Sequence, residues 1–231
     1  MTIIFNDKKQ LWGRLSKLLI EIFIIVFSIS LSFGIQNWSE YQKKQADVRE
    51  FLIGIKNDLK NDIKEMQEDK KSYLNQKKAF QFITQSRPQK DSLHRDSLKY
   101  YGFSIFNQVG LNPNNGRFEG FKSSGKLGDI ENKELQNLIL DLYQENIIQL
   151  IGNTNGYIKR KIRLDDFIIN NRKRITDTTS NLNKILLYDE AQNICQNLVF
   201  VDEIINRYDI CINKATKIIT LIDREYPQNL K

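Results

Sequence analysis

The apolar residues of the chain follow two distinct patterns. Near the N-terminus, Leu18 to Ile35 forms one apolar run of 18 residues whose single charge is Glu21. As an α-helix, this run would extend about 27 Å, close to the hydrocarbon thickness of a bilayer. After Trp38 the apolar residues recur in steps of three, four and seven, a spacing typical of amphipathic helices. The pattern therefore predicts one membrane-spanning helix followed by packed helices.

This division predicts three segments along the chain. Residues 1–17 are expected to be a cytoplasmic N-terminal segment, residues 18–38 a transmembrane anchor, and residues 39–231 a helical extramembrane domain. The anchor helix is expected to continue to about Phe82, because residues 38–82 lack proline and have one glycine, Gly54. Its apolar stripe consists of Val48, Leu52, Ile55, Leu59, Ile63, Met66, Tyr73 and Phe80.

Further helices are predicted toward the C-terminus. A short helix over residues 91–101 precedes a loop over 102–117, which is rich in glycine, proline and asparagine. Asn132 is the expected N-cap of a helix that runs to about Asn171, with Gly152 and Gly156 as places for a kink. The last helix is predicted as one element with Asp189 as its cap and with ten apolar positions at heptad spacing: Ala191, Ile194, Leu198, Val201, Ile205, Tyr208, Ile212, Ala215, Ile219 and Ile222.

These elements predict an all-α fold. The N-terminal transmembrane helix continues into a long helix, which packs in an antiparallel bundle of three or four helices. A coiled-coil oligomer is the alternative for helices with this heptad spacing.

The flanks of the apolar run carry residues typical of membrane interfaces. Trp12, Lys17, Trp38 and Tyr41 are candidate interfacial anchors. Four basic residues precede the run and three follow it, so the positive-inside rule places the N-terminus in the cytoplasm and the bulk in the periplasm. A cleaved signal peptide is the alternative to an anchor.

Within the run, Glu21, Ser28 and Ser32 fall on one helical face at positions i, i+7 and i+11. An ionisable group and small hydroxyl residues on one stripe indicate a helix–helix contact in the membrane. The alternative is a headgroup-level pair between Glu21 and Lys17, four residues earlier.

Composition is that of a globular protein, with 40% hydrophobic and 27% charged residues. The net charge of +7 does not come from a long basic block. Basic clusters at residues 159–163 and 172–174 flank the acidic pair Asp165-Asp166. This mixture favours a solvated helix face, with a patch for lipid headgroups or an acidic partner as the alternative, and argues against nucleic-acid binding.

The chemistry of a catalytic site is missing from the sequence. Gly120 to Lys126 matches seven positions of a phosphate-binding P-loop, but Leu127 stands where a magnesium-binding hydroxyl is needed. His94 is the single histidine, and Cys195 and Cys211 are expected to be free structural thiols. We therefore expect no enzyme activity, no cofactor and no metal.

Two stretches of the chain resemble a family of bacterial single-pass membrane proteins known as a domain of unknown function, widespread among Bacteroidota. The first is Glu21-Ile22 with the Ile35-Gln36-Asn37-Trp38-Ser39-Glu40 exit, and the second is Phe121 to Leu127 with Ile130 to Leu135. The resemblance implies a membrane anchor and a helical extramembrane domain. It implies no activity.

The function expected from these features is that of a helical scaffold or interaction protein in the bacterial envelope, anchored in the inner membrane by one pass. Its expected partners are the lipid bilayer and a membrane or envelope protein or a second copy. A sensor-like module that binds a ligand and acts through a membrane partner is the first alternative. A nucleotide-binding protein that uses the Gly120–Lys126 loop is the second.

Overall fold

The computed structural model describes residues 4–85, 95–173, 175 and 180–227, and side chains from residue 17 onward outside 86–99. It divides into two compact units, an N-terminal unit, Met1–Glu50, and a helical unit, Phe51–Lys231. Helix α1 (Ile4–Gln85) contributes to both. The sequence also predicts a helix break at Arg87-Pro88, and this position lies outside the described residues.

The N-terminal unit is the amino-terminal part of α1. An 18-residue window in it has a mean hydropathy of 2.5, and none of that window is buried. Its length and composition suffice to cross a membrane. Exposed apolar side chains run from Leu18 to Ile35, with exposed fractions near one half or higher. One candidate membrane-spanning helix therefore lies where the apolar run predicts it.

The helical unit adds short and long helices to the second part of α1. They are α2 (Arg95–Phe106), α3 (Gly116–Ser123), a 3-10 turn (Lys126–Asp129), α4 (Lys133–Asp141), a π-helical turn (Leu142–Asn146), α5 (Ile147–Asn171), α6 (Leu182–Ile185), α7 (Asp189–Leu198) and α8 (Asp202–Glu225). The all-α prediction is confirmed.

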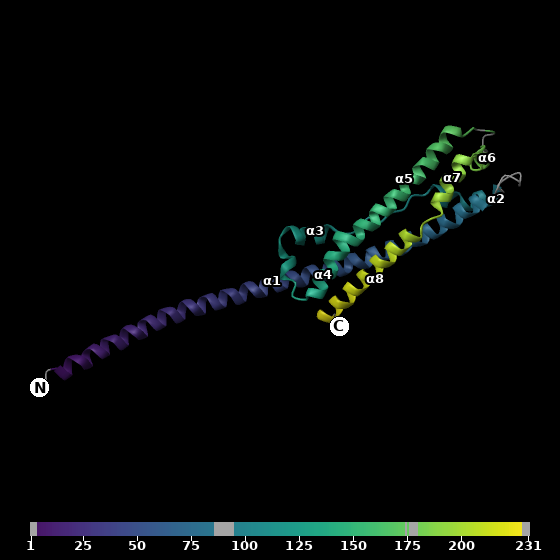
Figure 1. The fold of residues 1–231 in the computed structure, drawn as a ribbon. Helices are drawn as coiled ribbons and strands as arrows, with labels where there is room; N and C mark the ends of the chain where they lie inside the picture. Colours follow the sequence, from purple (N-terminus) through teal and green to yellow (C-terminus); the bar gives the residue numbers. More distant parts are fainter. Residues whose placement is uncertain (1–3, 86–94, 174, 176–179, 228–231) are drawn as a thin grey trace. The chain divides into compact units, whose positions relative to one another are not determined.

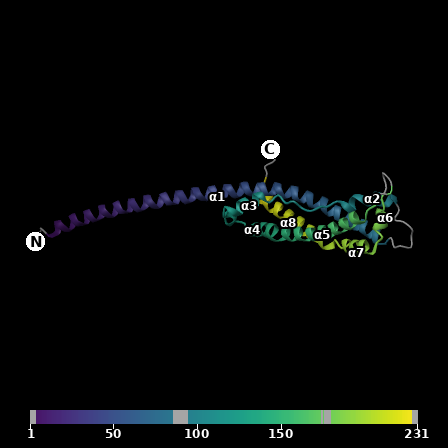
Figure 2. The ribbon, with the colours of Figure 1, turned by 90° about the horizontal axis from the view of Figure 1, so that it is seen from above.

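Within this unit, α5 and α8 lie alongside α1 (Figures 1 and 2). Side-chain pairs set the directions: α1 residues 56, 70 and 77 meet α8 residues 223, 209 and 202, so α8 is antiparallel to α1. Residues 73 and 76 of α1 meet residues 157 and 161 of α5, so α5 runs parallel to α1. The extended segment of residues 107–115, here called the strap, carries the chain back along α1.

The core follows the predicted stripe of α1 closely. Val48, Leu52, Ile55, Leu59, Met66, Tyr73 and Phe80 are all buried, and Ile63 is half-buried. Each fully buried aliphatic or aromatic side chain contributes about 1.5–3 kcal/mol to folding. Packing of this stripe is therefore the main source of stability for this part of α1.

The prediction of one C-terminal helix over residues 191–222 is wrong, because two helices replace it. Helix α7 ends at Leu198, and α8 begins at Asp202 after a tight turn in which the Val201 N–H donates to the Val199 carbonyl. Asp202 and Glu203 occupy the first turn of α8, where the helix dipole favours acidic side chains. The two cysteines therefore lie on different helices; both are free and buried.

Of the two predicted helix N-caps, Asn132 is confirmed and Asp189 is wrong. Asn132 is the N-cap of α4, and its side chain accepts the Leu135 N–H at 3.0 Å, as expected. Asp189, the predicted cap, is instead the first residue of α7, and Tyr188 is the N-cap. The interruption between α4 and α5 is the π-helical turn, which lies before Gly152 and Gly156.

Candidate functional site

The helical unit contains a line of polar side chains within its core. Asp62, Asp69 and Gln76 of α1 are 0%, 9% and 1% exposed and are spaced seven residues apart. That spacing places all three on one helical face. Because buried polar groups are costly without hydrogen-bond partners, the contacts of each one matter. Each finds its partner on a different part of the chain.

Asp69 contacts α8 next to a cluster of tyrosines. The Tyr208 hydroxyl donates to Asp69 Oδ2 at 2.8 Å. The Tyr73 ring lies 5.2 Å from the Tyr157 ring in an edge arrangement and 5.9 Å from the Tyr208 ring. Burial raises the pKa of the Asp69 carboxyl, while the Tyr208 hydrogen bond lowers it less. This contact joins α1 to α8.

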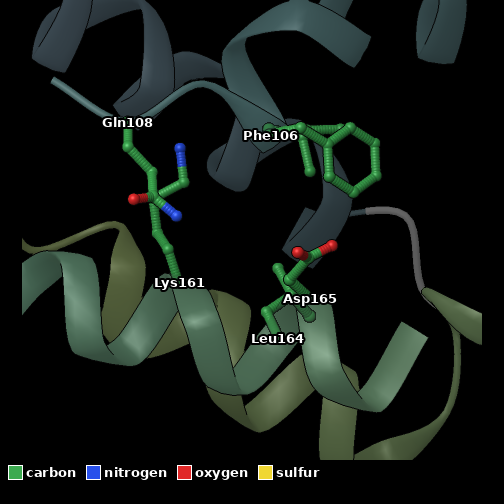
Figure 3. Close-up of a pocket in the computed structure, with 6 residues that line it drawn as sticks. Phe106, Gln108, Lys161, Leu164 and Asp165 are labelled. Carbon is green, nitrogen blue, oxygen red and sulfur yellow. The ribbon is translucent and has the colours of Figure 1, made fainter. Parts of the chain in front are cut away.

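Gln76 contacts α5 through a buried lysine. Lys161 is 4% exposed, and its Nζ donates to Gln76 Oε1 at 2.8 Å, to the Ser104 carbonyl at 3.3 Å and to the Asn107 carbonyl. Figure 3 shows its side chain rising from α5 toward the segment that carries Gln108. Burial lowers the pKa of Lys161 to about 8, against a smaller opposing effect of Asp165. One ammonium group thus joins α5, α1 and the start of the strap.

Asp62 contacts the other end of the strap. Its carboxylate accepts the Asn114 N–H at 3.1 Å and the Asn114 Nδ2 at 2.6 Å. Burial raises the pKa of Asp62, and the hydrogen bonds from Asn114 oppose this rise. The carboxylate therefore holds both the backbone and the side chain of one strap residue.

Two more α1 side chains hold the strap between these ends. The Asn112 N–H donates to Glu65 Oε1 at 2.9 Å, and the Tyr73 hydroxyl donates to the Val109 carbonyl at 2.8 Å. Together with Asp62, the side chains of Glu65 and Tyr73 are here called the α1 edge. Successive strap residues meet α1 in reverse order, so the strap runs antiparallel to the helix.

Beyond the strap, α3 is held to the same helix. Arg117 Nε donates to Asp58 Oδ2 at 3.0 Å, and the arginine side chain crosses α1 at Gly54. A Cβ at this glycine would lie 2.3 Å from the Arg117 Nε, so glycine permits the close approach. The Phe51 and Phe121 rings stack with centroids 3.9 Å apart.

A ladder of ion pairs fixes the register of α1 against α8. Lys56 pairs with Asp223 at 2.9 Å, Lys70 with Asp209 at 2.5 Å, and Lys77 with Asp202 at 2.7 Å. The steps are 14 and 7 residues on both helices, so a slip of one helix would break all three pairs. The Lys56 side chain is 2% exposed, whereas those of Lys70 and Lys77 are 30% and 26% exposed.

This difference in burial predicts unequal effects of the same substitution. Asp223→Ala strands the buried Lys56 ammonium and is expected to lower the free energy of unfolding by about 2 kcal/mol. Asp202→Ala removes an exposed partner and is expected to cost less than about 1 kcal/mol. Urea unfolding of the full chain in detergent, followed by circular dichroism, measures both. Equal losses would contradict the prediction, and Lys56→Met added to Asp223→Ala should restore part of the stability.

A pocket lies between α2 and α5 above Lys161. Phe106 and Gln108 line one side, and Lys161, Leu164 and Asp165 line the other (Figure 3). Ile105 also lines the pocket. Its volume is about 10 Å³, which suits one water molecule. A drug-sized ligand needs several hundred cubic ångströms.

The predicted membrane-helix face consists of exposed residues. The Ser28 hydroxyl donates to the Ile24 carbonyl at 2.7 Å, and the Ser32 hydroxyl donates to the Ser28 carbonyl at 2.8 Å. Glu21 is exposed. The hydroxyls thus satisfy their donors within α1, and the helix contact stays a prediction.

The predicted interfacial anchors lie on the same helix. Trp38 and Tyr41 are 65% and 45% exposed, and Lys17 is exposed as well. The side chain of Trp12 lies outside the described part of the chain. Their contact with a membrane interface stays a prediction.

The segment that resembles a P-loop is a helix end. Gly120 to Ser123 closes α3, and Gly125 adopts φ +73°, a conformation that glycine accommodates readily. The Ser124 and Gly125 amides donate to the Gly120 and Lys122 carbonyls. These two amides are therefore already occupied, and a 3-10 turn follows in place of the long helix of a P-loop.

Titratable side chains do not assemble a metal site within the described ranges: no group of three or more His, Cys, Asp or Glu is placed to hold an ion. His94 lies outside those ranges. Burial raises the pKa of Cys195 to about 12 and that of Cys211 to about 11. Such thiols are poor nucleophiles at neutral pH.

The basic cluster at residues 159–163 is predicted to form a solvated helix face, and one of its residues, Lys161, does not fit this prediction. Lys159 and Arg163 are exposed, but Lys161 is buried and fully hydrogen-bonded. Its three acceptors come from α1, α2 and the strap, which the spacing of charges along α5 does not indicate. The same holds for Asp62, Asp69 and Gln76, which sequence reasoning did not single out.

Comparison with known proteins gives a match to one protein family. Neither the curated proteins nor the solved structures include a match to this chain. A family of unknown function, DUF6090, matches residues 21–203, which include most of the candidate membrane-spanning run, the strap and helices α2 to α7. The predicted resemblance to a domain of unknown function is confirmed to this extent. The chain belongs to the DUF6090 family.

Proposed function

We propose that this protein is a membrane-anchored interaction protein of the bacterial envelope, held in the inner membrane by α1 residues 18–35. The observation that carries the proposal is the 18-residue window with a mean hydropathy of 2.5 and no buried share. Isolated apolar side chains are common on protein surfaces, but a continuous exposed run of this length is not. Lipid is the environment that suits it.

The orientation follows from the flanking charges. Lys8, Lys9, Arg14 and Lys17 precede the run, and three basic residues follow it before Phe51. The positive-inside rule then favours a cytoplasmic N-terminus and a periplasmic helical unit. An N-terminal tag that resists protease in intact spheroplasts and is cut after lysis supports this orientation. A tag cut in intact spheroplasts contradicts it.

The interaction role is supported by the make-up of the helical unit. Its polar core joins helices to one another, so the buried titratable groups Asp69, Lys161 and Lys56 serve structural hydrogen bonds and ion pairs. The pocket at Lys161 admits one water molecule and gives no support to a small-ligand sensor. The alternative that uses nucleotide gains no support from the helix end at Gly125.

Charge placed in the apolar run is expected to release the protein from membranes. Ile24→Arg combined with Phe27→Arg adds about 2.5–3.5 kcal/mol per arginine to the free energy of insertion. The full-length wild-type protein should stay in the membrane pellet after an alkaline carbonate wash, and the variant should move to the supernatant.

The matched control places the same charge on equally exposed side chains elsewhere. Ile148 and Ile169 are 60% and 62% exposed on α5, compared with 56% for both Ile24 and Phe27. Ile148→Arg combined with Ile169→Arg should stay in the pellet. Wild-type protein in the supernatant, with its N-terminus intact, would overturn the anchor and with it the proposed function.

A further inference from the structure

The strap is held by contacts to its backbone. The α1 edge accepts two strap amides, at Glu65 and Asp62, and donates one hydrogen bond from Tyr73 to a strap carbonyl. Contacts of this kind recognise an extended chain and tolerate many sequences. The surface beneath the strap is therefore chemically suited to extended peptides in general.

Two side chains add specificity to this backbone recognition. Leu111 is 7% exposed, and the Asn114 amide donates to Asp62 Oδ1 at 2.6 Å. Gln108, between α2 and the rest of the strap, is exposed. The α1 edge and its surroundings thus recognise an apolar residue followed, three positions later, by a residue with a side-chain amide.

The strap is weakly anchored compared with the helices on either side. Between residues 107 and 115, Leu111 is the one buried side chain, whereas α1 alone buries a stripe of large apolar residues. Segments with few buried apolar contacts open at a lower free energy than the core. Opening of the strap therefore does not require the helices to unfold.

We propose that the α1 edge binds an extended segment of a partner protein, and that the strap is the occupant supplied by the chain itself. This inference rests on the proposed interaction function and names the partner's chemistry. The partner segment offers two backbone amides to Asp62 and Glu65, a carbonyl to Tyr73, and the apolar and amide side chains of the Leu111–Asn114 motif. Displacement of the strap exposes the edge.

Because the strap is covalently tethered to the α1 edge, it competes strongly with a free segment that makes the same contacts. A segment joined to its site by a short linker acts at an effective concentration on the order of 1 mM. A free peptide with equal contacts at about 1 μM would then occupy roughly one site in a thousand. The wild-type protein is therefore expected to bind such a peptide weakly, and a weakened strap is expected to expose the site.

The experiment measures binding of a fluorescein-labelled peptide with the sequence of residues 105–116 to the full chain in detergent, by fluorescence anisotropy. Leu111→Ser removes the buried anchor of the strap and leaves the α1 edge intact. It should bind the peptide at least about tenfold more tightly than the wild type. Adding Asp62→Ala should abolish the gain, whereas adding Asp166→Ala, at an exposed position on α5, should retain it.

Gln108→Ser is the matched control within the strap, because Gln108 is exposed. It should bind the peptide as weakly as the wild type. Circular dichroism and the melting temperature confirm that each variant is folded. Equal binding by the wild type and folded Leu111→Ser, or binding unchanged by Asp62→Ala, would overturn the proposal.

Hydrogen exchange of the wild type tests the opening itself and does not depend on a variant that folds. The Asn112 and Asn114 amides should exchange at rates that low urea does not change, while amides of α1, α5 and α8 respond to urea. The same urea dependence at the strap and in the helices would overturn the proposal. Membrane fractionation is unaffected by these outcomes, so the anchor and the strap are tested separately.

Discussion

Replacement of Lys161 by alanine is expected to lower the free energy of unfolding by about 3–4 kcal/mol. The ammonium donates to Gln76 Oε1 and to two carbonyls, at Ser104 and Asn107. Each buried acceptor left without a donor costs about 1–3 kcal/mol, reduced where water can enter. Alanine also leaves a cavity where the aliphatic stem packed. Urea unfolding in detergent at pH 7, followed by circular dichroism, measures the loss.

Lys159→Ala is the control for this substitution, because Lys159 lies on α5 two residues earlier and is exposed. It should change the free energy of unfolding by no more than about 0.5 kcal/mol. Losses of similar size for the two variants would mean that Lys161 does not join the strap to α1 and α5.

The same buried lysine is expected to contribute more to the stability of the folded protein as the pH rises from 7 to 10. The Lys161 pKa is about 8 in the folded protein and about 10.5 in the unfolded chain, so the unfolded chain binds more protons in this range. The contribution of Lys161 to the free energy of unfolding should therefore rise by about 2 kcal/mol, while Cys195 and Cys211, whose pKa burial raises, oppose this rise above about pH 9. Above about pH 10 the free energy of unfolding should fall further, because burial also raises the pKa of Tyr73, Tyr157 and Tyr208.

Lys161→Met tests this assignment, because methionine has a similar shape and no titrating group. Between pH 7 and 10, the free energy of unfolding of the wild type should rise by about 2 kcal/mol relative to that of Lys161→Met, and the decline caused by the cysteines and tyrosines should be present in both proteins. A difference between the two proteins that stays constant from pH 7 to 10 would contradict the lowered pKa of Lys161.

Periodicity predicted the long helices because burial of one face is a local property of the sequence. The stripe from Val48 to Phe80 and the Asn132 cap both follow from spacing and side-chain type. The break at residues 199–201 did not follow, because the apolar spacing continues across it.

The buried face of α8 also differs in part from the predicted one. Tyr208, Ala215 and Ile222 are buried as the spacing predicts. The predicted core residues Ile205, Ile212 and Ile219 are half-buried, and the residue before each of them is buried instead: Ile204, Cys211 and Ile218. Adjacent apolar residues satisfy the same helical spacing, so the packing of α8 against its neighbours decides which one of each pair faces the core.

The buried polar residues of α1 appear in the sequence as gaps in its apolar stripe, but the spacing alone does not identify their partners. The apolar stripe of α1 steps by seven from Met66 to Tyr73 and again to Phe80, which omits one core position in each heptad. Asp69 and Gln76 occupy those positions. A polar residue at a core position indicates a buried partner, but its identity depends on contacts between distant parts of the chain. Lys161 lies 85 residues from Gln76, and Tyr208 lies 139 residues from Asp69.

The pairing of α1 with α8 has a consequence for biosynthesis. The three ion pairs join residues 125, 139 and 167 positions apart, so α1 leaves the ribosome long before the helix that covers it. Contacts of such long sequence separation form late and slow folding. Until α8 has been synthesised, the core-facing stripe of α1 stays open to aggregation or to chaperones. Nascent chains that stop before Asp202 should therefore be the species that chaperones retain.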